Sequence, residues 1–191
     1  MTKKHQSSTE LAFITGPTYL TILRMVLSII FMLFALHPDI WAHVVALTIF
    51  AAAAITDKVD GNWARKSHQV TDLGAFLDPL ADKMLVNLAF LVLVYTDVVP
   101  IWVFAVILVR DFAVDGMRMM SARNGVTIAA SFYGKLKTTI QMIALVVLLL
   151  NLILNQEFLY IVGMVILYVA LALTVFSGID YISKGRGLLI K

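Results

Sequence analysis

Hydrophobic residues along the chain are gathered into six long stretches that short polar segments separate. A transmembrane helix needs about 20 predominantly apolar residues to cross roughly 30 Å of hydrocarbon. The six stretches are close to this length, or reach it through their polar flanks, and run from Leu20 to Leu36, Ile40 to Thr56, Leu80 to Tyr95, Ile101 to Met120, Leu136 to Leu150 and Phe158 to Ile179. The pattern therefore predicts an all-α, polytopic membrane protein with six transmembrane helices.

Turn-forming residues mark the boundaries between these stretches. They predict breaks at residues 37–39, at Gly61, and at 97–100, 123–125 and 151–157. No internal repeat or low-complexity linker interrupts the chain. We therefore predict a single domain over residues 1–191.

A short segment upstream of the first stretch has a different character. Residues 7–14 are too few to span a membrane, but Ser8 or Thr9 followed by Glu10 forms a capped helix start. We expect a short N-terminal interfacial helix here. The domain would then consist of an interfacial segment at 1–19, a six-helix core at 20–182 and a basic cytoplasmic tail at 183–191.

Composition strengthens the membrane prediction and excludes other classes. The 191 residues are 61% hydrophobic and 14% charged, whereas soluble domains are about 45–50% apolar and about 25% charged. A soluble enzyme and a disordered binding protein are therefore excluded. The chain has no cysteine, which also excludes thiolate metal sites and cysteine nucleophiles.

The positive charges are distributed unevenly across the predicted membrane. The connections near residues 37–40, 96–100 and 151–157 contain no Lys or Arg, and all 15 of these residues lie toward the other side. Lys and Arg are retained on the cytoplasmic side during insertion. We therefore expect a multi-pass protein of the cell membrane with both termini in the cytoplasm, which agrees with an even number of spans.

Four aspartates lie in pairs near the cytoplasmic ends of the second and third stretches. Asp57 and Asp60 are three residues apart, and Asp78 and Asp82 are four apart, so each pair shares a helix face. A hairpin of the two helices can bring all four carboxylates together, where they repel one another unless something neutralises them. Such oxygen ligands suit Mg²⁺ or Mn²⁺. Two metals held by shared carboxylates are a known device for phosphoryl displacement. A solvated helix cap would explain one aspartate better than four at this spacing.

The same segment carries a specific motif. From Asp57 to Asp82 the chain follows the pattern D-x2-D-G-x2-A-R-x8-G-x3-D-x3-D without a gap. This pattern resembles the signature of the CDP-alcohol phosphotransferase family, and the resemblance covers the six-span chain. Members of that family transfer a substituted phosphate from a CDP-linked lipid or alcohol to a second hydroxyl and release CMP.

The resemblance implies a role for each motif position. Asp57, Asp60 and Asp78 resemble the metal ligands, and Asp82 resembles the general base that takes the acceptor's proton, with a metal contact also open to it. Five further positions resemble the nucleotide-binding residues of the family, namely Thr21, Gly61, Ala64, Arg65 and Gly74. The implied cofactor is Mg²⁺ or Mn²⁺ in a two-metal site.

A second, basic set bears on the acceptor. It consists of Arg110, Arg118, Lys135 and Lys137. Gathered together, these residues would form a phosphate pocket, since Arg makes forked contacts with phosphate and Lys acts as a point charge. Asp111 and Asp115 lie on the same side of the helix as the two arginines, so an internal ion-pair network is the alternative interpretation. We expect a phosphorylated acceptor.

Within the family, three segments are most similar to bacterial members that join sn-glycerol 3-phosphate to CDP-diacylglycerol in phospholipid synthesis. They are residues 76–83, 110–118 and 134–142. The family's N-terminal pattern P-N-x-L-T-x2-R is also echoed, although Thr18 replaces its Asn, and Asp115 stands where a small hydroxyl residue is common. The resemblance implies a homodimer in contact with membrane lipid, and nothing suggests a nucleic acid partner.

Two alternatives remain open at this point. A related enzyme could use another acceptor, such as inositol 1-phosphate, phosphatidylglycerol or serine, although the four basic residues argue against serine. A divalent-cation transporter could use the same aspartates as an ion path. The transporter is disfavoured because the acids gather at one membrane face and no chain of polar residues continues to the other.

Overall fold

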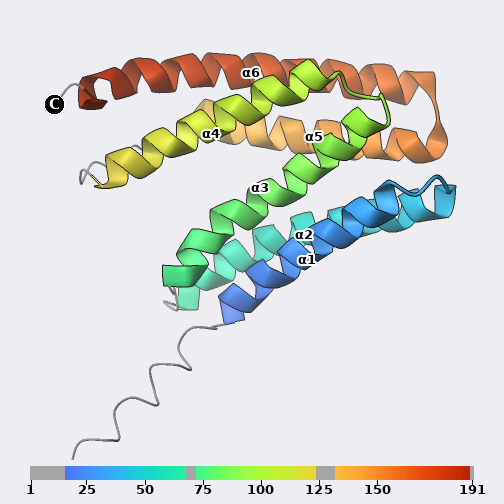
Figure 1. Ribbon diagram of the computed structural model, residues 1–191, viewed down its shortest axis with the longest axis horizontal. Coiled ribbons are helices and arrows are strands. Elements are labelled where there is room, and N and C mark those ends of the chain that lie inside the picture. Colours follow the sequence, from blue (N-terminus) through green and yellow to red (C-terminus); the bar gives the residue numbers. More distant parts are fainter. Residues whose placement is uncertain (1–15, 68–71, 124–131, 190–191) are drawn as a thin grey trace, which may run out of the picture. The chain divides into compact units, whose positions relative to one another are not determined.

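The computed structural model describes the backbone of residues 16–67, 72–123 and 132–189. Side chains are described within these helices and their links at residues 19–56, 80–81, 83–121, 134, 136–179 and 181. The described residues form six helices and no strand (Figure 1), in the order α1 (Gly16–Ala35), α2 (Ile40–Ser67), α3 (Asp72–Tyr95), α4 (Ile101–Arg123), α5 (Phe132–Leu154) and α6 (Glu157–Leu189). The all-α prediction is therefore confirmed for these residues.

The chain divides between Val92 and Leu93 into two compact units, and α3 runs through the division. In the first unit α1 packs against α2, and in the second α6 packs against both α4 and α5. Figure 1 shows each of these neighbouring pairs. In the second unit, α4 and α5 therefore both pack around α6.

Small residues allow the two helices of the first unit to approach closely. Phe31 of α1 and Phe50 of α2 are fully buried, with ring centroids 5.5 Å apart. On α2, Ala42, Ala46 and Ala53 lie on the same buried face as Phe50, at helical spacing. Small side chains at such positions favour helix association in a membrane.

The expected breaks at 97–100 and 151–157 are confirmed, and each contains a residue with a positive φ. Asp97 has φ 56° and Asn155 has φ 48°, a conformation that Asp and Asn adopt more readily than most residues. After α5, the backbone N–H of Asn155 donates to the carbonyl of Asn151 at 2.8 Å, and the Asn151 side chain accepts from the N–H of Gln156 at 3.1 Å. The break at 37–39 is confirmed as well, since α1 ends at Ala35 and α2 begins at Ile40.

The break predicted at Gly61 is wrong. Helix α2 continues through this residue to Ser67. A single glycine inside a helix costs only about 0.5–1 kcal/mol relative to alanine, which a helix of this length tolerates. Near the C-terminus, α6 continues ten residues beyond the predicted end at Ile179, to Leu189. The interfacial helix expected at residues 7–14 lies outside the described residues.

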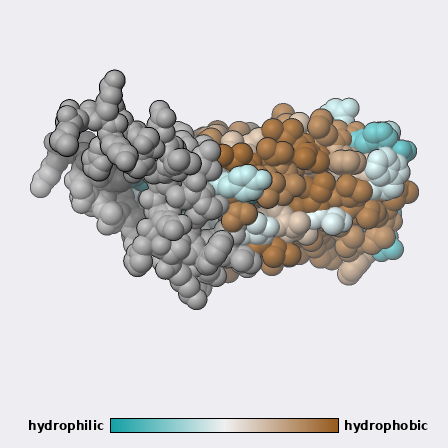
Figure 2. All heavy atoms as spheres, turned by 90° about the horizontal axis from the view of Figure 1, so that it is seen from below, coloured by the Kyte–Doolittle hydropathy of each residue, from teal (hydrophilic) through white to brown (hydrophobic). Residues whose placement is uncertain are grey.

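Among the residues whose side chains are described, two helical segments are long and apolar enough to cross a membrane, Leu136–Leu154 and Glu157–Ile179. Three shorter apolar segments accompany them in the described residues, namely Tyr19–Ala35, Ile40–Thr56 and Lys83–Tyr95. Large apolar side chains are exposed on these and on α4, such as Phe158 (73% exposed) and Val109 (68%). Figure 2 shows hydrophobic residues over most of the coloured surface. Exposed apolar surface of this extent is consistent with a membrane protein.

A glycine sets the distance between α5 and α6, and its replacement should destabilise the second unit. A Cβ added at Gly163 would lie 2.8 Å from Cγ of the buried Leu148. We expect Gly163→Ala to cost about 1–3 kcal/mol by overpacking, and therefore to lower the thermal midpoint in detergent by about 5 °C. Gly116→Ala is the matched control, because nothing lies within 4 Å of the added Cβ. Equal midpoints for the two variants would contradict this account of the packing.

Candidate active site

The four motif aspartates lie on two continuous helices. Helix α2 is unbroken across Asp57 and Asp60, and α3 is unbroken across Asp78 and Asp82, so each pair keeps the helical spacing that the sequence suggested. The side chains of all four lie outside the described side chains, as do those of Gly61, Ala64, Arg65 and Gly74. Among the residues that the structure does describe, no group of three or more acidic, His or Cys residues could hold a metal. The metal site therefore stays a prediction.

Two residues of the N-terminal motif, Thr21 and Arg24, form a buried polar stripe on α1 together with Ser28. Thr21, Arg24 and Ser28 are all buried, and their spacing places them on one helix face. The Ser28 hydroxyl donates to the carbonyl of Arg24 at 2.7 Å. Buried polar groups in an apolar helix are costly unless they are satisfied or functional, so this stripe marks a side of α1 that differs from its apolar remainder.

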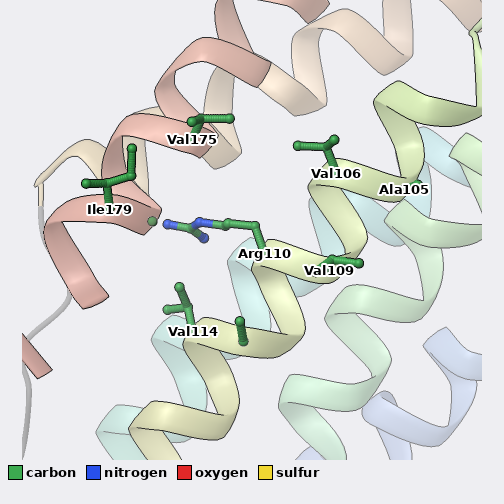
Figure 3. Close-up of a pocket in the computed structure, with 9 residues that line it drawn as sticks. Ala105, Val106, Val109, Arg110, Val114, Val175 and Ile179 are labelled. Carbon is green, nitrogen blue, oxygen red and sulfur yellow. The ribbon is translucent and has the colours of Figure 1, made fainter. Parts of the chain in front are cut away.

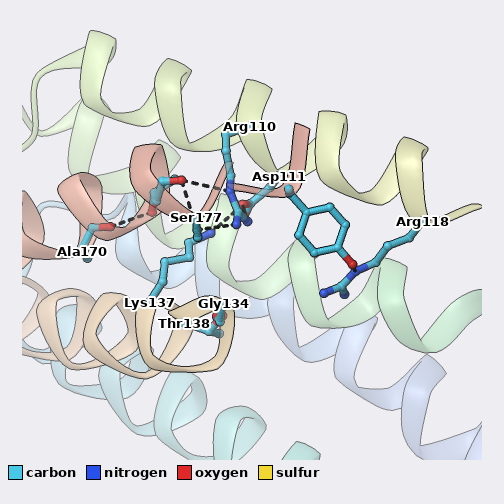
Figure 4. A network of polar contacts seen from close by, with 10 residues as sticks. Arg110, Asp111, Arg118, Gly134, Lys137, Thr138, Ala170 and Ser177 are labelled. Carbon is cyan, nitrogen blue, oxygen red and sulfur yellow. Dashed lines mark hydrogen bonds and ion pairs between the residues drawn. The ribbon is translucent and has the colours of Figure 1, made fainter. Parts of the chain in front are cut away.

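In the second unit, a carboxylate links two of the predicted phosphate-binding residues. One carboxylate oxygen of Asp111 accepts from the Arg110 guanidinium at 3.1 Å and from the Lys137 ammonium at 2.5 Å. The Lys137 side chain is only 3% exposed, and that of Arg110 is 16% exposed. Figure 4 shows Arg110 and Lys137 converging on Asp111. The alternative interpretation, an internal ion-pair network, is therefore confirmed for Arg110 and Lys137. Together with Asp111 these residues form a cluster with a net positive charge.

Arg110 also reaches across to α6. Its Nε donates to the Thr174 carbonyl at 3.2 Å, and its Nη2 donates to the Ser177 hydroxyl at 2.6 Å. The path of the arginine side chain runs close to Gly178, where an added Cβ would lie 3.1 Å from the Arg110 Cγ. Glycine at this position therefore leaves the space that the arginine needs.

Arg118 occupies a separate place on α4. Eight residues separate it from Arg110, which is about 12 Å along the helix axis. Its Nε donates to the Tyr181 hydroxyl at 3.0 Å, and its guanidinium carbon lies 5.3 Å from the centre of that ring. The structure thus joins Arg110 to Lys137 through Asp111 and docks Arg118 separately on α6, while the side chain of Lys135 lies outside the described side chains.

A groove of about 460 Å³ runs between α4 and α6 beside this network. Its walls are almost entirely aliphatic, and Arg110 is the one charged residue among the described residues that line it (Figure 3). The lining residues are Ala105, Val106, Val109, Arg110, Ala113, Val114, Val175, Gly178 and Ile179. Arg110 extends across the groove from α4 toward α6.

The contact residues on α6 were not among the candidates from the sequence. Thr174, Ser177, Gly178 and Tyr181 touch or make room for the two arginines. A signal was present, because these residues recur at the spacing of one helix face in a helix that is otherwise mostly apolar. That spacing alone does not identify the helix that the face meets.

The chain belongs to the CDP-alcohol phosphatidyltransferase family, whose model matches residues 14–176. It is therefore a phosphatidyltransferase, and the resemblance read from the motif is confirmed. The matched region includes all four motif aspartates and the Arg110–Asp111–Lys137 cluster.

Individual relatives resemble the chain over most of its length. It is 41% identical over 180 residues to the CDP-diacylglycerol–glycerol-3-phosphate 3-phosphatidyltransferase of Bacillus subtilis, a match that covers 88% of this chain and 93% of the relative. It is 40% identical over 179 residues to the protein of the same name from Salmonella paratyphi A, covering 91% and 96%. A probable phosphatidylglycerophosphate synthase of Mycobacterium tuberculosis is 39% identical over 168 residues, covering 86% and 78%.

Proposed function

We propose that the protein transfers the phosphatidyl group of CDP-diacylglycerol to sn-glycerol 3-phosphate, giving phosphatidylglycerophosphate and CMP for phospholipid synthesis. The observation that carries this proposal is the similarity of about nine-tenths of the chain to relatives named for that reaction. The Arg110–Asp111–Lys137 cluster supports it independently, because its net positive charge suits an acceptor that carries a phosphate.

The proposed chemistry assigns the aspartates to two tasks. Asp57, Asp60 and Asp78 would hold Mg²⁺ or Mn²⁺, with Asp82 able to contribute, and the donor set fits because carboxylate oxygens are the ligands these ions prefer. When bound, these ions would supply positive charge that stabilises the diphosphate and the leaving CMP. Thr21, Gly61, Ala64, Arg65 and Gly74 bind the nucleotide part of CDP-diacylglycerol.

Asp82 acts as the general base. It takes the proton from the attacking hydroxyl of glycerol 3-phosphate as the hydroxyl oxygen bonds to the lipid-side phosphorus. The bond from that phosphorus to the bridging oxygen of the diphosphate breaks, and CMP leaves with that oxygen. The new phosphodiester stays in the membrane because it carries the two acyl chains.

The basic residues hold the acceptor by its phosphate. Of the five N–H groups that a guanidinium offers, Arg110 directs three to Thr174, Asp111 and Ser177, so two are left for a ligand. Arg118 is exposed and adds a second guanidinium, and Lys135 and Lys137 complete the pocket. Fixed donors of this kind orient the acceptor hydroxyl for in-line attack.

The proposal includes the topology expected from the sequence. Six helices cross the cell membrane as a single domain, the site and both termini face the cytoplasm, and two copies form a homodimer. The exposed apolar side chains and the two long apolar segments support this arrangement. The absence of Lys and Arg from alternate connections supports the sidedness.

The direct test is the release of CMP from CDP-diacylglycerol by the purified protein in detergent. The assay contains Mg²⁺ or Mn²⁺ and one acceptor at a time: glycerol 3-phosphate, inositol 1-phosphate, phosphatidylglycerol or serine. We expect metal-dependent release with glycerol 3-phosphate alone. Release with a different acceptor would overturn the proposed substrate and keep the enzyme class. Metal uptake into vesicles without any dependence on CDP-diacylglycerol would instead favour the transporter.

A further inference from the structure

Three polar residues and one glycine form a buried stripe on α6. Thr174, Ser177, Gly178 and Tyr181 follow one another at intervals of three, one and three residues, which places them on one helix face. All four are buried, although the surrounding helix is mostly aliphatic. The Thr174 hydroxyl donates to the Ala170 carbonyl of its own helix at 2.6 Å. Because α6 packs against α4, the remaining acceptor oxygens of this face can accept hydrogen bonds from the neighbouring helix.

The partners are the two arginines of α4. The backbone carbonyl of Thr174 and the hydroxyl of Ser177 accept hydrogen bonds from Arg110, at 3.2 and 2.6 Å, and the Tyr181 hydroxyl accepts one from Arg118 at 3.0 Å. The Tyr181 ring adds a cation–π contact with the same guanidinium. Every polar member of the stripe therefore contacts an arginine that the proposed function assigns to the acceptor phosphate.

The stripe fixes the orientation of Arg110 as well as its position. The Ser177 hydroxyl donates its hydrogen to the Thr174 carbonyl at 3.2 Å. The lone pairs of the hydroxyl oxygen are then turned toward the Arg110 guanidinium, from which the oxygen accepts a hydrogen bond. The carbonyl, the hydroxyl and Asp111 take one N–H each from Nε, Nη2 and Nη1. A planar guanidinium held at all three nitrogens cannot rotate, which sets the direction of its two remaining N–H groups.

We propose that this α6 stripe positions Arg110 and Arg118 for the acceptor phosphate, with Ser177 and Tyr181 as positioning residues and Gly178 as the space through which Arg110 passes. The inference rests on the proposed function of the two arginines. The stripe itself does not touch the substrate. It acts by presenting guanidinium groups that are already oriented, so that binding the phosphate does not have to order them.

Two hydroxyl deletions test the role with matched controls. We expect Ser177→Ala and Tyr181→Phe each to raise KM for glycerol 3-phosphate about tenfold, the effect of losing one hydrogen bond to a charged group. Both kcat and KM for CDP-diacylglycerol should stay within about twofold, because the chemical step is untouched. The control for Ser177→Ala is Thr48→Val, which removes an exposed hydroxyl that hydrogen-bonds within its own helix. The control for Tyr181→Phe is Tyr168→Phe, at a tyrosine of α6 that packs on Trp102. Neither control should change KM for glycerol 3-phosphate.

A third variant leaves every polar atom of the stripe in place. Gly178→Ala puts a methyl group against the Arg110 Cγ, so we expect it to raise KM for the acceptor as Ser177→Ala does. Gly116→Ala, on the open side of α4, is its control. In an Arg110→Gln background, Ser177→Ala should add nothing further, because a residue that acts only through Arg110 has no effect without it. Full additivity would overturn the inference.

A binding measurement separates this inference from the proposed function. Glycerol 3-phosphate or inorganic phosphate should raise the thermal midpoint of the wild-type protein in detergent, and should raise it less in Ser177→Ala, Tyr181→Phe and Gly178→Ala. An equal rise in all three variants, or no rise in the wild type, overturns the positioning role. If phosphate stabilises the wild type but CMP is released only with another acceptor, the proposed substrate fails and the comparison of midpoints still decides the role of the stripe.

Discussion

Asp82→Asn and Asp78→Asn should each abolish CMP release while leaving the protein folded. Asparagine keeps the size of aspartate but can neither take the acceptor's proton nor neutralise a divalent cation. Loss of a general base lowers kcat by about 10²–10⁴-fold, and loss of a metal ligand should have an effect of the same order. The measurement is the rate of CMP release at saturating CDP-diacylglycerol and glycerol 3-phosphate, with the thermal midpoint in detergent as the test of folding.

The chain offers a matched control for these two variants. Asp97 lies exposed in the link between α3 and α4 with φ 56°, a conformation that asparagine also tolerates. Asp97→Asn should therefore retain wild-type activity and stability. Removal of divalent cations with a chelator should stop the wild-type reaction, and added Mg²⁺ or Mn²⁺ should restore it. Full activity in either Asp78→Asn or Asp82→Asn would refute the proposed mechanism.

Asp111→Ala should produce the largest loss of stability among the variants considered. It leaves the ammonium of Lys137, which is 3% exposed, without its carboxylate. Breaking a buried pair in this way costs about 3–5 kcal/mol, because the remaining charge stays buried and unpaired. For a protein of this size we expect the thermal midpoint to fall by roughly 10 °C. The KM for glycerol 3-phosphate should rise as well, since Arg110 loses one of its three anchors.

The double variant distinguishes the two effects. Asp111→Ala combined with Lys137→Met removes both charges and should recover most of the lost stability, while the acceptor KM stays high because Lys137 is gone. Glu157→Ala, which removes an exposed carboxylate at the start of α6, is the control for the loss of a carboxylate itself. A midpoint of Asp111→Ala within about 2 °C of the wild type would contradict the importance of this pair.

The ends of most helices could be predicted from the sequence because local residues determine them. The turns around Asp97 and Asn155 contain residues that tolerate a positive φ, and each has a polar neighbour, Thr96 and Gln156 respectively. Gly61 misled the prediction, since a glycine indicates a turn only when the surrounding residues also disfavour a helix. The extension of α6 to Leu189 was missed because hydropathy indicates where a helix leaves the hydrocarbon and not where its hydrogen bonds end.

The candidate site was predictable to a different extent in its two halves. The family motif identified the four aspartates, and their assembly into one metal site remains a prediction because it depends on how α2 and α3 meet. In the basic set, the pairing of Arg110 with Asp111 was foreseen as an alternative, since helical geometry places the arginines and aspartates of this segment on the same side of the helix. The contacts of the arginines with Ser177 and Tyr181 bridge more than 60 residues. The periodicity of a single helix cannot reveal such a contact.

The link between Arg110, Asp111, Lys137 and Ser177 also bears on how the protein is made. In the proposed topology α4 carries Arg110, Asp111, Asp115 and Arg118 along its length, and such charged residues are costly in hydrocarbon. The lysine that completes the ion pair lies on α5, and the hydroxyl that receives the guanidinium lies on α6. A nascent chain that ends after α4 has neither. The fourth helix is therefore expected to settle stably in the bilayer only once the last two helices have been synthesised, so that biogenesis of this half of the protein is completed as a three-helix unit.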